Sequence, residues 1–286
     1  MSTTDRMKAD MATAYDRIAE EYDHSGVEYY EPLARVLVAR ARLRAGDRVL
    51  DLGCGTGNVL FPAARAVAPG GTVVGIDLSR NMIARAEAAV SQQGLHDVTL
   101  AVMDGEAPEY PPASFDAVLS NVSVTLFPGA PAALRRYRDL LRPGGRLVFT
   151  APVFDGDGFP SVLPSALKDT LRRMISLLHE VGFPKPYMDS GLWFGDAPSL
   201  RHALRSAGFD EVDVVEEPLT MAMESGEMWL RWLWVHAAMR LFWDRLDPRH
   251  QEELAAAIAE ELDALRDVDG VIRYDVTARS VVAFPA

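Results

Sequence analysis

The sequence predicts an α/β protein built on a doubly wound, mostly parallel sheet of seven strands. Short apolar runs alternate with segments whose apolar residues recur at helical spacing, and strands separated by helices form right-handed parallel units. The runs are almost continuously apolar, as in Thr72–Ile76, which is typical of parallel strands covered on both faces. The chain has 286 residues. At roughly 150 residues per domain, this length suits one enlarged domain.

The pattern of apolar residues predicts an N-terminal helical cap over residues 1–45. Apolar and aromatic residues recur at three- and four-residue spacing through Asp5–Tyr22, and Pro32–Leu43 repeats the pattern. Residues at these intervals share one face of a helix. We therefore expect two amphipathic helices before the first strand.

The central part, residues 46–151, predicts the parallel core of the sheet. The first strand, Arg48–Leu52, ends in the glycine turn Gly53–Gly57, and a helix follows at Val59–Val67. We predict further strands at Thr72–Asp77, Val98–Met103, Ala117–Leu119 and Gly145–Ala151, and further helices at Asn81–Gln93 and Ala130–Leu141.

After residue 151 the amino-acid composition of the chain changes. Pro152–Pro160 is rich in Pro, Gly and Asp, which marks a change of module. We divide the remainder into an insertion or lid at 152–198, a core helix and strand at 199–219, a Trp- and Met-rich helical lid at 220–271, and the last core strand at 272–286. The predicted elements are helices at Ser165–Val181 and Ser199–Ala207, a strand at Glu211–Val215, a helical block at Met221–Val271 and a strand at Asp275–Phe284.

Charge and composition exclude several classes of partner. Asp and Glu number 41 against 29 Lys and Arg, a net charge of −12, so we expect no nucleic-acid partner, since such binding depends on clustered basic residues. The most apolar window, Met228–Trp243, is too short to span a bilayer, and we expect no membrane insertion. The lone Cys54 cannot form an internal disulfide, and Met1–Arg17 lacks a signal-peptide stretch. These features predict a cytoplasmic protein.

The glycine turn predicts a close approach between backbone and ligand. Gly53, Gly55 and Gly57 follow a strand and open a helix, where the absence of a Cβ permits such contact. A dinucleotide fingerprint would have a small residue where this chain has Asn58.

Carboxylates at the ends of three strands indicate which chemical groups the ligand carries. Asp51 lies just before the turn and suits a cationic ammonium better than a pyrophosphate. Asp77 ends the second strand, where a carboxylate can accept both hydroxyls of a ribose. Asp104 follows the third strand at the same edge of the sheet. Together they predict a nucleoside with a positive amino-acid arm and no phosphates.

The turn, the strand ends and several further segments match a known family in their order. These segments are Tyr15–Asp23, Val49–Gly57, Gly75–Ser79, Asp104–Glu106, Ser114–Val118, Leu141–Val148 and Ala207–Val212. They resemble the class I S-adenosylmethionine-dependent methyltransferases, above all the small-molecule branch with the ubiquinone and menaquinone biosynthesis enzymes. The resemblance covers about residues 12–219 and the last strand. It implies a Rossmann-like methyltransferase fold, S-adenosyl-L-methionine as cofactor and S-adenosyl-L-homocysteine as product.

The resemblance also implies a cofactor site. Its predicted residues are Tyr15, Tyr22, Asp51, Gly53, Cys54, Gly55, Thr56, Asp77, Leu78, Met82, Asp104, Gly105, Glu106 and Asn121. Asp51 and the turn would hold the methionine arm, Asp77 the ribose, and Asp104 with Gly105 the adenine. Taken singly, Asp77 or Asp104 could equally be a solvated strand-end carboxylate. Cys54 is interpreted as a small buried residue and not as a nucleophile.

Methyl transfer depends on holding two reactants in line and benefits from a dry pocket, so we expect a lid. The Met221–Val271 block is the candidate because it holds most of the tryptophans and its central helix is apolar on two faces. We predict a substrate pocket lined by Trp193, Trp229, Trp232, Leu233 and Trp243. The equal alternative is that these aromatics only fill the interface between helix and sheet.

His236 shares a helix face with Trp229 and Arg240 and is the predicted general base for a hydroxyl or phenol acceptor. A structural histidine is the alternative. No cluster of His, Cys and carboxylates has the spacing of a metal site, so we expect no metal.

The predicted function is transfer of a methyl group, by in-line displacement, onto oxygen or carbon of a hydrophobic small molecule such as a secondary metabolite, by a monomer or homodimer. The alternative is a protein of this fold that binds the cofactor without transferring methyl, as an electrostatic catalyst or scaffold. A nicotinamide oxidoreductase is disfavoured by Asn58 and Asp51.

Overall fold

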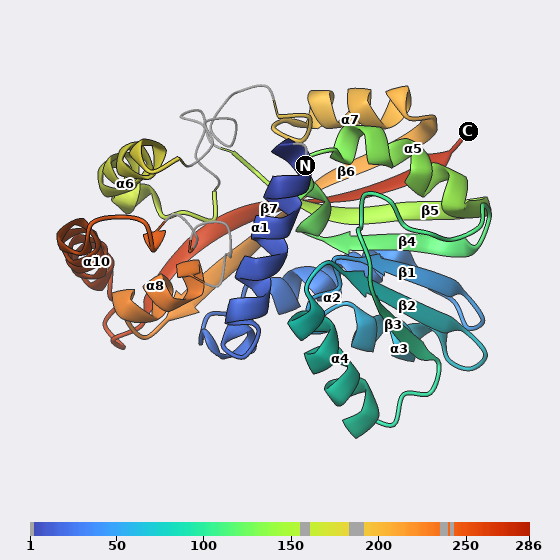
Figure 1. The fold of residues 1–286 in the computed structure, drawn as a ribbon, viewed down its shortest axis with the longest axis horizontal. Helices are drawn as coiled ribbons and strands as arrows, with labels where there is room; N and C mark the ends of the chain where they lie inside the picture. Colours follow the sequence, from blue (N-terminus) through green and yellow to red (C-terminus); the bar gives the residue numbers. More distant parts are fainter. Residues whose placement is uncertain (1–2, 155–160, 183–191, 235–239, 241–242) are drawn as a thin grey trace.

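The computed structural model describes residues 3–154, 161–182, 192–234, 240 and 243–286, and its centre is a seven-stranded sheet in the order β3-β2-β1-β4-β5-β7-β6 (Figure 1). Strands β1 to β5 pair in parallel, whereas β7 runs antiparallel to both β5 and β6. The strands are β1 (Arg48–Leu52), β2 (Thr72–Asp77), β3 (Val98–Val102), β4 (Phe115–Asn121), β5 (Leu141–Pro152), β6 (Phe209–Met223) and β7 (Ile272–Pro285). The predicted fold class is confirmed.

Helices cover both faces of the sheet, which explains why the central strands are apolar throughout. Figure 1 shows α5 and α7 on one side and α2, α3 and α4 on the other, each layer packing its buried apolar residues on the strands. The described helices are α1 (Thr3–Ile18), α2 (Tyr30–Ala41), α3 (Leu60–Val67), α4 (Arg80–Gln92), α5 (Ala130–Leu140), α6 (Lys168–Glu180), α7 (Ala197–Ser206), α8 (Gly226–Trp234) and α10 (Pro248–Asp263). Short 3-10 helices lie at Tyr22–His24, Ser123–Leu126 and Ser165–Leu167. This layering leaves the ligand crevice at the carboxyl ends of the parallel strands.

Strand β6 runs well beyond the strand predicted at Glu211–Val215, and the predicted helical block from Met221 therefore begins as a strand. Beyond the end of β5, β6 and β7 continue as a two-stranded antiparallel ribbon that begins with Pro218 opposite Thr277 and ends at Met223 opposite Ile272. Proline is tolerated at position 218 because β6 is an edge strand, one of the few places in a sheet where proline is found.

Helices α6, α8 and α10 gather around the far end of this ribbon, at the left of Figure 1, and we call them together with the ribbon the distal cluster. Leu219, Met221 and Met223 turn toward these helices at strand spacing. The tryptophans Trp229 and Trp232 of α8 are fully buried in the same apolar cluster. The aromatic residues of this region therefore lie in an apolar core, which continues toward the N-terminal helices through Tyr29, whose ring meets Trp232 edge-on at 5.7 Å between centroids.

A single hydroxyl joins three parts of the distal cluster, and its removal is expected to weaken the cluster. The Tyr274 hydroxyl accepts a hydrogen bond from Trp229 Nε1 (2.7 Å) and donates one to the carbonyl oxygen of Val162 (3.0 Å). Replacing Tyr274 with Phe leaves both groups without this partner, at a cost of about 1–3 kcal/mol in the free energy of unfolding. Denaturant unfolding measures the loss. Tyr110→Phe, which keeps a ring packed edge-on against Phe115 of the main sheet and removes only its hydroxyl, is the control and should leave the stability nearly unchanged.

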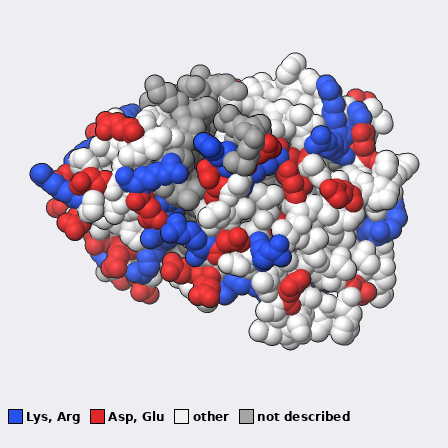
Figure 2. Space-filling view, viewed as in Figure 1, with Lys and Arg blue, Asp and Glu red and all other residues white. Residues whose placement is uncertain are grey.

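Acidic and basic side chains are interspersed on the face shown in Figure 2 and are densest over the distal cluster. Many form exposed pairs, such as Arg173 and Arg249 with Glu253, which contribute little to stability individually. In the described part of the chain, no helix combines the length and the apolar character needed to cross a membrane.

Candidate functional site

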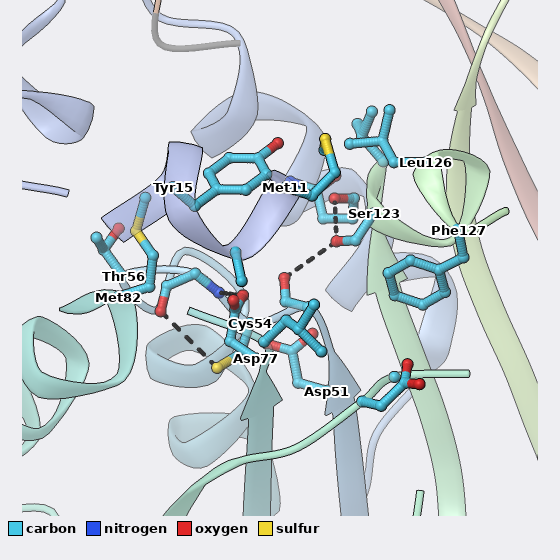
Figure 3. A pocket seen from close by; sticks show the side chains of 18 of the residues that line it. Met11, Tyr15, Asp51, Cys54, Thr56, Asp77, Met82, Ser123, Leu126 and Phe127 are labelled. Atoms are coloured by element: carbon cyan, nitrogen blue, oxygen red, sulfur yellow. Dashed lines mark hydrogen bonds between the residues drawn. The ribbon is translucent and has the colours of Figure 1, made fainter. Parts of the chain in front are cut away.

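A pocket lies where β1, β2 and β4 end, and α1 crosses over it (Figure 3). Met11 and Tyr15 of α1 face it from one side, and Asp51 and Asp77 from the strand ends on the other. The pocket therefore has a charged floor, formed by the sheet, and a largely apolar roof.

The glycine turn gives the pocket an open backbone surface. Gly53 and Gly55 have φ values of +64° and +54°, a region that favours glycine. A Cβ at Gly53 would lie 2.5 Å from the Cβ of Ser123, so a larger residue would push the neighbouring loop away. The amide of Gly55 donates to Asp77 Oδ2 (2.9 Å), and the amide of Ser79 donates to Oδ1 (2.9 Å). Asp77 thus links the turn to the start of α4.

Asp51 is a buried carboxylate that forms no ion pair with any residue that the structure describes. It is 1% exposed, and neither of its oxygens has a hydrogen-bond partner among the described residues. Desolvation, followed by repulsion from Asp77, holds the pKa of Asp51 well above its usual range. Desolvation also raises the pKa of Asp77, partly offset by the amides of Ser79 and Gly55. An orphaned carboxylate lining a pocket fits a cationic group of a ligand.

The other end of the pocket is closed by ion pairs from α1. Lys8 Nζ lies 2.7 Å from Asp104 Oδ2 and 2.6 Å from Glu106 Oε2. Glu106 also accepts a hydrogen bond from the amide of Gly129 (2.8 Å). Burial lowers the pKa of Lys8, but its hydrogen bonds with the two carboxylates outweigh this and raise the pKa above its ordinary value.

Asn121 holds the wall beside the turn. Its Nδ2 donates to the carbonyl oxygen of Tyr30 (2.9 Å), and its Oδ1 accepts from the hydroxyl of Thr150 (2.7 Å). The same Thr150 hydroxyl accepts from the amide of Val122 (2.9 Å), a residue with φ of +63°. Thr150 thereby fixes both Asn121 and a strained residue of the pocket loop.

Three tyrosines form the aromatic wall. The rings of Tyr22 and Tyr30 stack with centroids 5.7 Å apart, and Tyr15 meets Tyr22 edge-on at 6.3 Å. Desolvation raises the pKa of both Tyr22 and Tyr30 well above 10.0, so these phenols stay protonated at neutral pH. Thr56 is held by Asp23, whose Oδ1 accepts from its hydroxyl (2.8 Å).

The structure brings all the residues predicted for the cofactor together around this one pocket. They are Tyr15, Tyr22, Asp51, Gly53, Cys54, Gly55, Thr56, Asp77, Leu78, Met82, Asp104, Gly105, Glu106 and Asn121. The residues that also line it, but that sequence reasoning did not assign to the cofactor, are Lys8, Met11, Ala12, Tyr30, Asn58, Val59, Val122, Ser123, Leu126, Phe127 and Pro128. Lys8, Met11 and Ala12 carried a signal, because they share a helix face with Tyr15.

The residues predicted for the substrate pocket do not line this cavity. Trp229, Trp232, Leu233 and Trp243 are buried in the distal cluster. Trp193 packs against Phe149 and Phe194 beside the sheet. Their contact with an acceptor stays a prediction, and the observed packing matches the alternative of an apolar interface. His236 lies outside the described residues.

Comparisons with known proteins agree with this geometry. Residues 43–188 match the family described as "Methyltransferase domain". Nocamycin O-methyltransferase of Saccharothrix syringae is 37% identical over 265 residues, which cover 87% of this chain and 90% of that protein. Aklanonic acid methyltransferase DauC of Streptomyces sp. (strain C5) is 38% identical over 203 residues, which cover 71% and 92%.

A solved structure with a similar fold is the YcgJ protein of Bacillus subtilis, with a TM-score of 0.58 and 14% identity, covering 88% of this chain and 97% of that one. The family match, the two sequence relatives and the strand order agree. The chain belongs to the class I S-adenosyl-L-methionine-dependent methyltransferases of the small-molecule type, and loss of the methyl group converts that cofactor to S-adenosyl-L-homocysteine.

Proposed function

We propose that this enzyme methylates an oxygen of a hydrophobic, polyketide-like small molecule. The observation that carries the proposal is the match to nocamycin O-methyltransferase over 90% of that protein, which extends beyond the cofactor-binding core. The aklanonic acid methyltransferase supports it, because that relative is also named for a small organic acceptor and is 38% identical.

The pocket residues fit the cofactor, and we assign them as follows. Asp51 would neutralise the ammonium of the methionine arm, which explains why this buried carboxylate has no hydrogen-bond partner among the residues that the structure describes. Asp77 would bind the ribose, Leu78 and Met82 would pack along the adenosine, and Asp104 with Gly105 and Glu106 would form the adenine end. When bound, the cofactor supplies a methyl group on a sulfonium.

The remaining contribution of the chain is positioning and exclusion of water. Met11, Ala12 and Tyr15 of α1 cover the pocket, and Tyr22 and Tyr30 form an aromatic wall. Holding reactants in line can supply about 7–11 kcal/mol of the barrier reduction. The protonated phenols of Tyr22 and Tyr30 can donate hydrogen bonds but cannot serve as bases at neutral pH.

Turnover with cofactor carrying an isotope label in its methyl group tests the proposal. The enzyme is incubated with a panel of aromatic polyketide acids, phenols and enols, and the products are examined by mass spectrometry and NMR. Label on an oxygen of an acceptor supports the proposal, and label found only on carbon or nitrogen contradicts it. A variant with Asp51 replaced by Asn provides the background rate.

We also propose that the reaction takes place in the cytoplasm. Cys54 is buried and is the one cysteine of the sequence, so no disulfide joins two parts of this chain. Disulfides are typical of oxidising compartments and rare in the cytoplasm. Cell fractionation of the native host with an antibody against the protein tests the assignment, and recovery outside the cytoplasmic fraction contradicts it.

Removing the Thr150 hydroxyl is expected to loosen the pocket wall. Thr150→Val deletes the bonds to Asn121 and Val122, so the affinity for S-adenosyl-L-homocysteine should fall about five- to tenfold, in line with roughly 1 kcal/mol for such contacts. Calorimetric titration measures the change. Thr150→Ser retains the hydroxyl and should bind nearly as the parent does, so equal losses in both variants would contradict the role of the hydroxyl.

A further inference from the structure

Helix α1 is fixed at two places on either side of the pocket. At one, Lys8 pairs with Asp104 and Glu106. At the other, Asp16 Oδ1 accepts from the hydroxyl of Ser79 (2.6 Å) and from the amide of Asn81 (2.9 Å). Lys8 and Asp16 are eight positions apart on the helix, about 12 Å at 1.5 Å per residue.

The residues between the attachments roof the pocket. Met11, Ala12 and Tyr15 lie between Lys8 and Asp16 on α1 and line the cavity (Figure 3). Each attachment reaches a segment directly after a strand end, Ser79 after β2 and Asp104 after β3. The roof is therefore tied to the same strand ends that we assign to the ribose and the adenine.

Lys8 supplies the counter-charge of the adenine end. The side chain of Glu106 is 8% exposed, and one of its oxygens is occupied by the amide of Gly129. Its other oxygen and Asp104 Oδ2 share the ammonium of Lys8, whose side chain is 21% exposed. If α1 moved away, the buried carboxylate of Glu106 would lose its cation, and a buried unpaired charge is costly. The position of α1 is thus electrostatically coupled to the adenine end.

We propose that Lys8 is a positioning residue for the cofactor: its two ion pairs lock α1 over the adenine end, and breaking them is a step in the exchange of S-adenosyl-L-homocysteine for S-adenosyl-L-methionine. The inference rests on the cofactor placement given above and is independent of the acceptor. Its consequence is a rate of product dissociation that depends on salt, because partly exposed ion pairs are screened.

The test measures dissociation of S-adenosyl-L-homocysteine by stopped-flow competition with excess S-adenosyl-L-methionine. Lys8→Met should raise the dissociation rate about tenfold, as the loss of roughly 1.4 kcal/mol predicts. Lys8→Arg keeps the charge and should stay near the parent rate. Arg6→Met removes an exposed charge from the same helix and should leave the rate unchanged.

Two further measurements, the salt dependence of dissociation and amide hydrogen exchange, distinguish a Lys8 that locks α1 over the cofactor from a Lys8 that only stabilises the fold. Raising NaCl to about 1 M, where screening acts over about 3 Å, should accelerate dissociation from the parent and from Arg6→Met, but much less from Lys8→Met. Amide exchange in α1 of the cofactor-bound protein should accelerate more in Lys8→Met than exchange in the central strands β1 and β4, which distinguishes release of α1 from a general loss of stability.

An unchanged or slower dissociation rate in Lys8→Met, or Lys8→Arg behaving like Lys8→Met, would overturn the proposal. Failure to find an acceptor would not affect this measurement, because it uses the cofactor product alone. Conversely, confirming that Lys8 holds α1 over the cofactor would not decide which atom of the acceptor is methylated.

Discussion

Replacing Asp51 with Asn is expected to weaken the binding of S-adenosyl-L-methionine and S-adenosyl-L-homocysteine by about 100-fold or more. The substitution keeps the shape of the side chain but removes the charge that we assign to the ammonium, and losing one partner of a buried charge pair costs about 2–5 kcal/mol. Calorimetric titration measures both affinities. Asp97→Asn, an exposed carboxylate just before β3 at the opposite edge of the sheet, is the matched control and should bind as the parent does.

A ligand without the amino-acid arm tests whether Asp51 acts on the ammonium group. Methylthioadenosine contains the adenine and ribose but no amino-acid arm, so Asp51→Asn should bind it nearly as tightly as the parent. An equal loss for methylthioadenosine and for S-adenosyl-L-homocysteine would mean that Asp51 does not act on the ammonium.

The same substitution is expected to change the pH dependence of stability in the cofactor-free protein. Desolvation raises the folded-state pKa of Asp51 above the unfolded value near 3.8. The folded protein therefore retains a proton that the unfolded chain releases, and the resulting stability is complete below the unfolded pKa and is lost as pH rises through the folded pKa. The parent should lose stability with rising pH over this window. Asp51→Asn should lose less stability over the same pH range. Identical pH profiles of the unfolding free energy, measured with urea, would contradict the raised pKa of Asp51.

Asp77→Ala is expected to weaken all three ligands by about 10- to 100-fold, because each contains the ribose and because charged hydrogen bonds contribute about 1.5–3 kcal/mol. Asp77 also holds the amides of Gly55 and Ser79, so its removal loosens the glycine turn. Titration with methylthioadenosine is the deciding measurement, since the loss should appear here for Asp77→Ala and not for Asp51→Asn. Unchanged affinity in Asp77→Ala would remove Asp77 from the ribose site.

The parallel core could be predicted from the sequence because its local signals agree with its tertiary environment. Arg48–Leu52 and Thr72–Asp77 are short apolar runs bounded by clear turns, and the structure gives the same limits for β1 and β2. The end of β6 was missed because Glu216, Glu217 and Pro218 look like the end of a strand. Pairing with β7 and burial of Met221 against the distal helices determine its true length, and neither is local.

The cofactor residues could be predicted for a similar reason: most of them directly follow a strand, and parallel strands bring their carboxyl ends to one edge. The position of the methyl acceptor could not be predicted from the sequence. A row of tryptophans such as Trp229 and Trp232 has the same sequence pattern whether it faces a pocket or a core, and only packing against Met221 and Tyr274 distinguishes the two. Lys8 was missed because its partners lie about 100 residues away in the chain.

The ribbon of β6 and β7 has a consequence for how the molecule opens. An isolated two-stranded hairpin is only marginally stable in water, and past the end of β5 no third strand pairs with this ribbon in the described parts of the chain. Its order therefore depends on α6, α8 and α10, which in turn bury their apolar faces on the ribbon. Elements that are stable only together open together. We expect the distal cluster to unfold as one cooperative unit at a lower free energy than the sheet, while the strand ends around Asp51 and Asp77 remain in place.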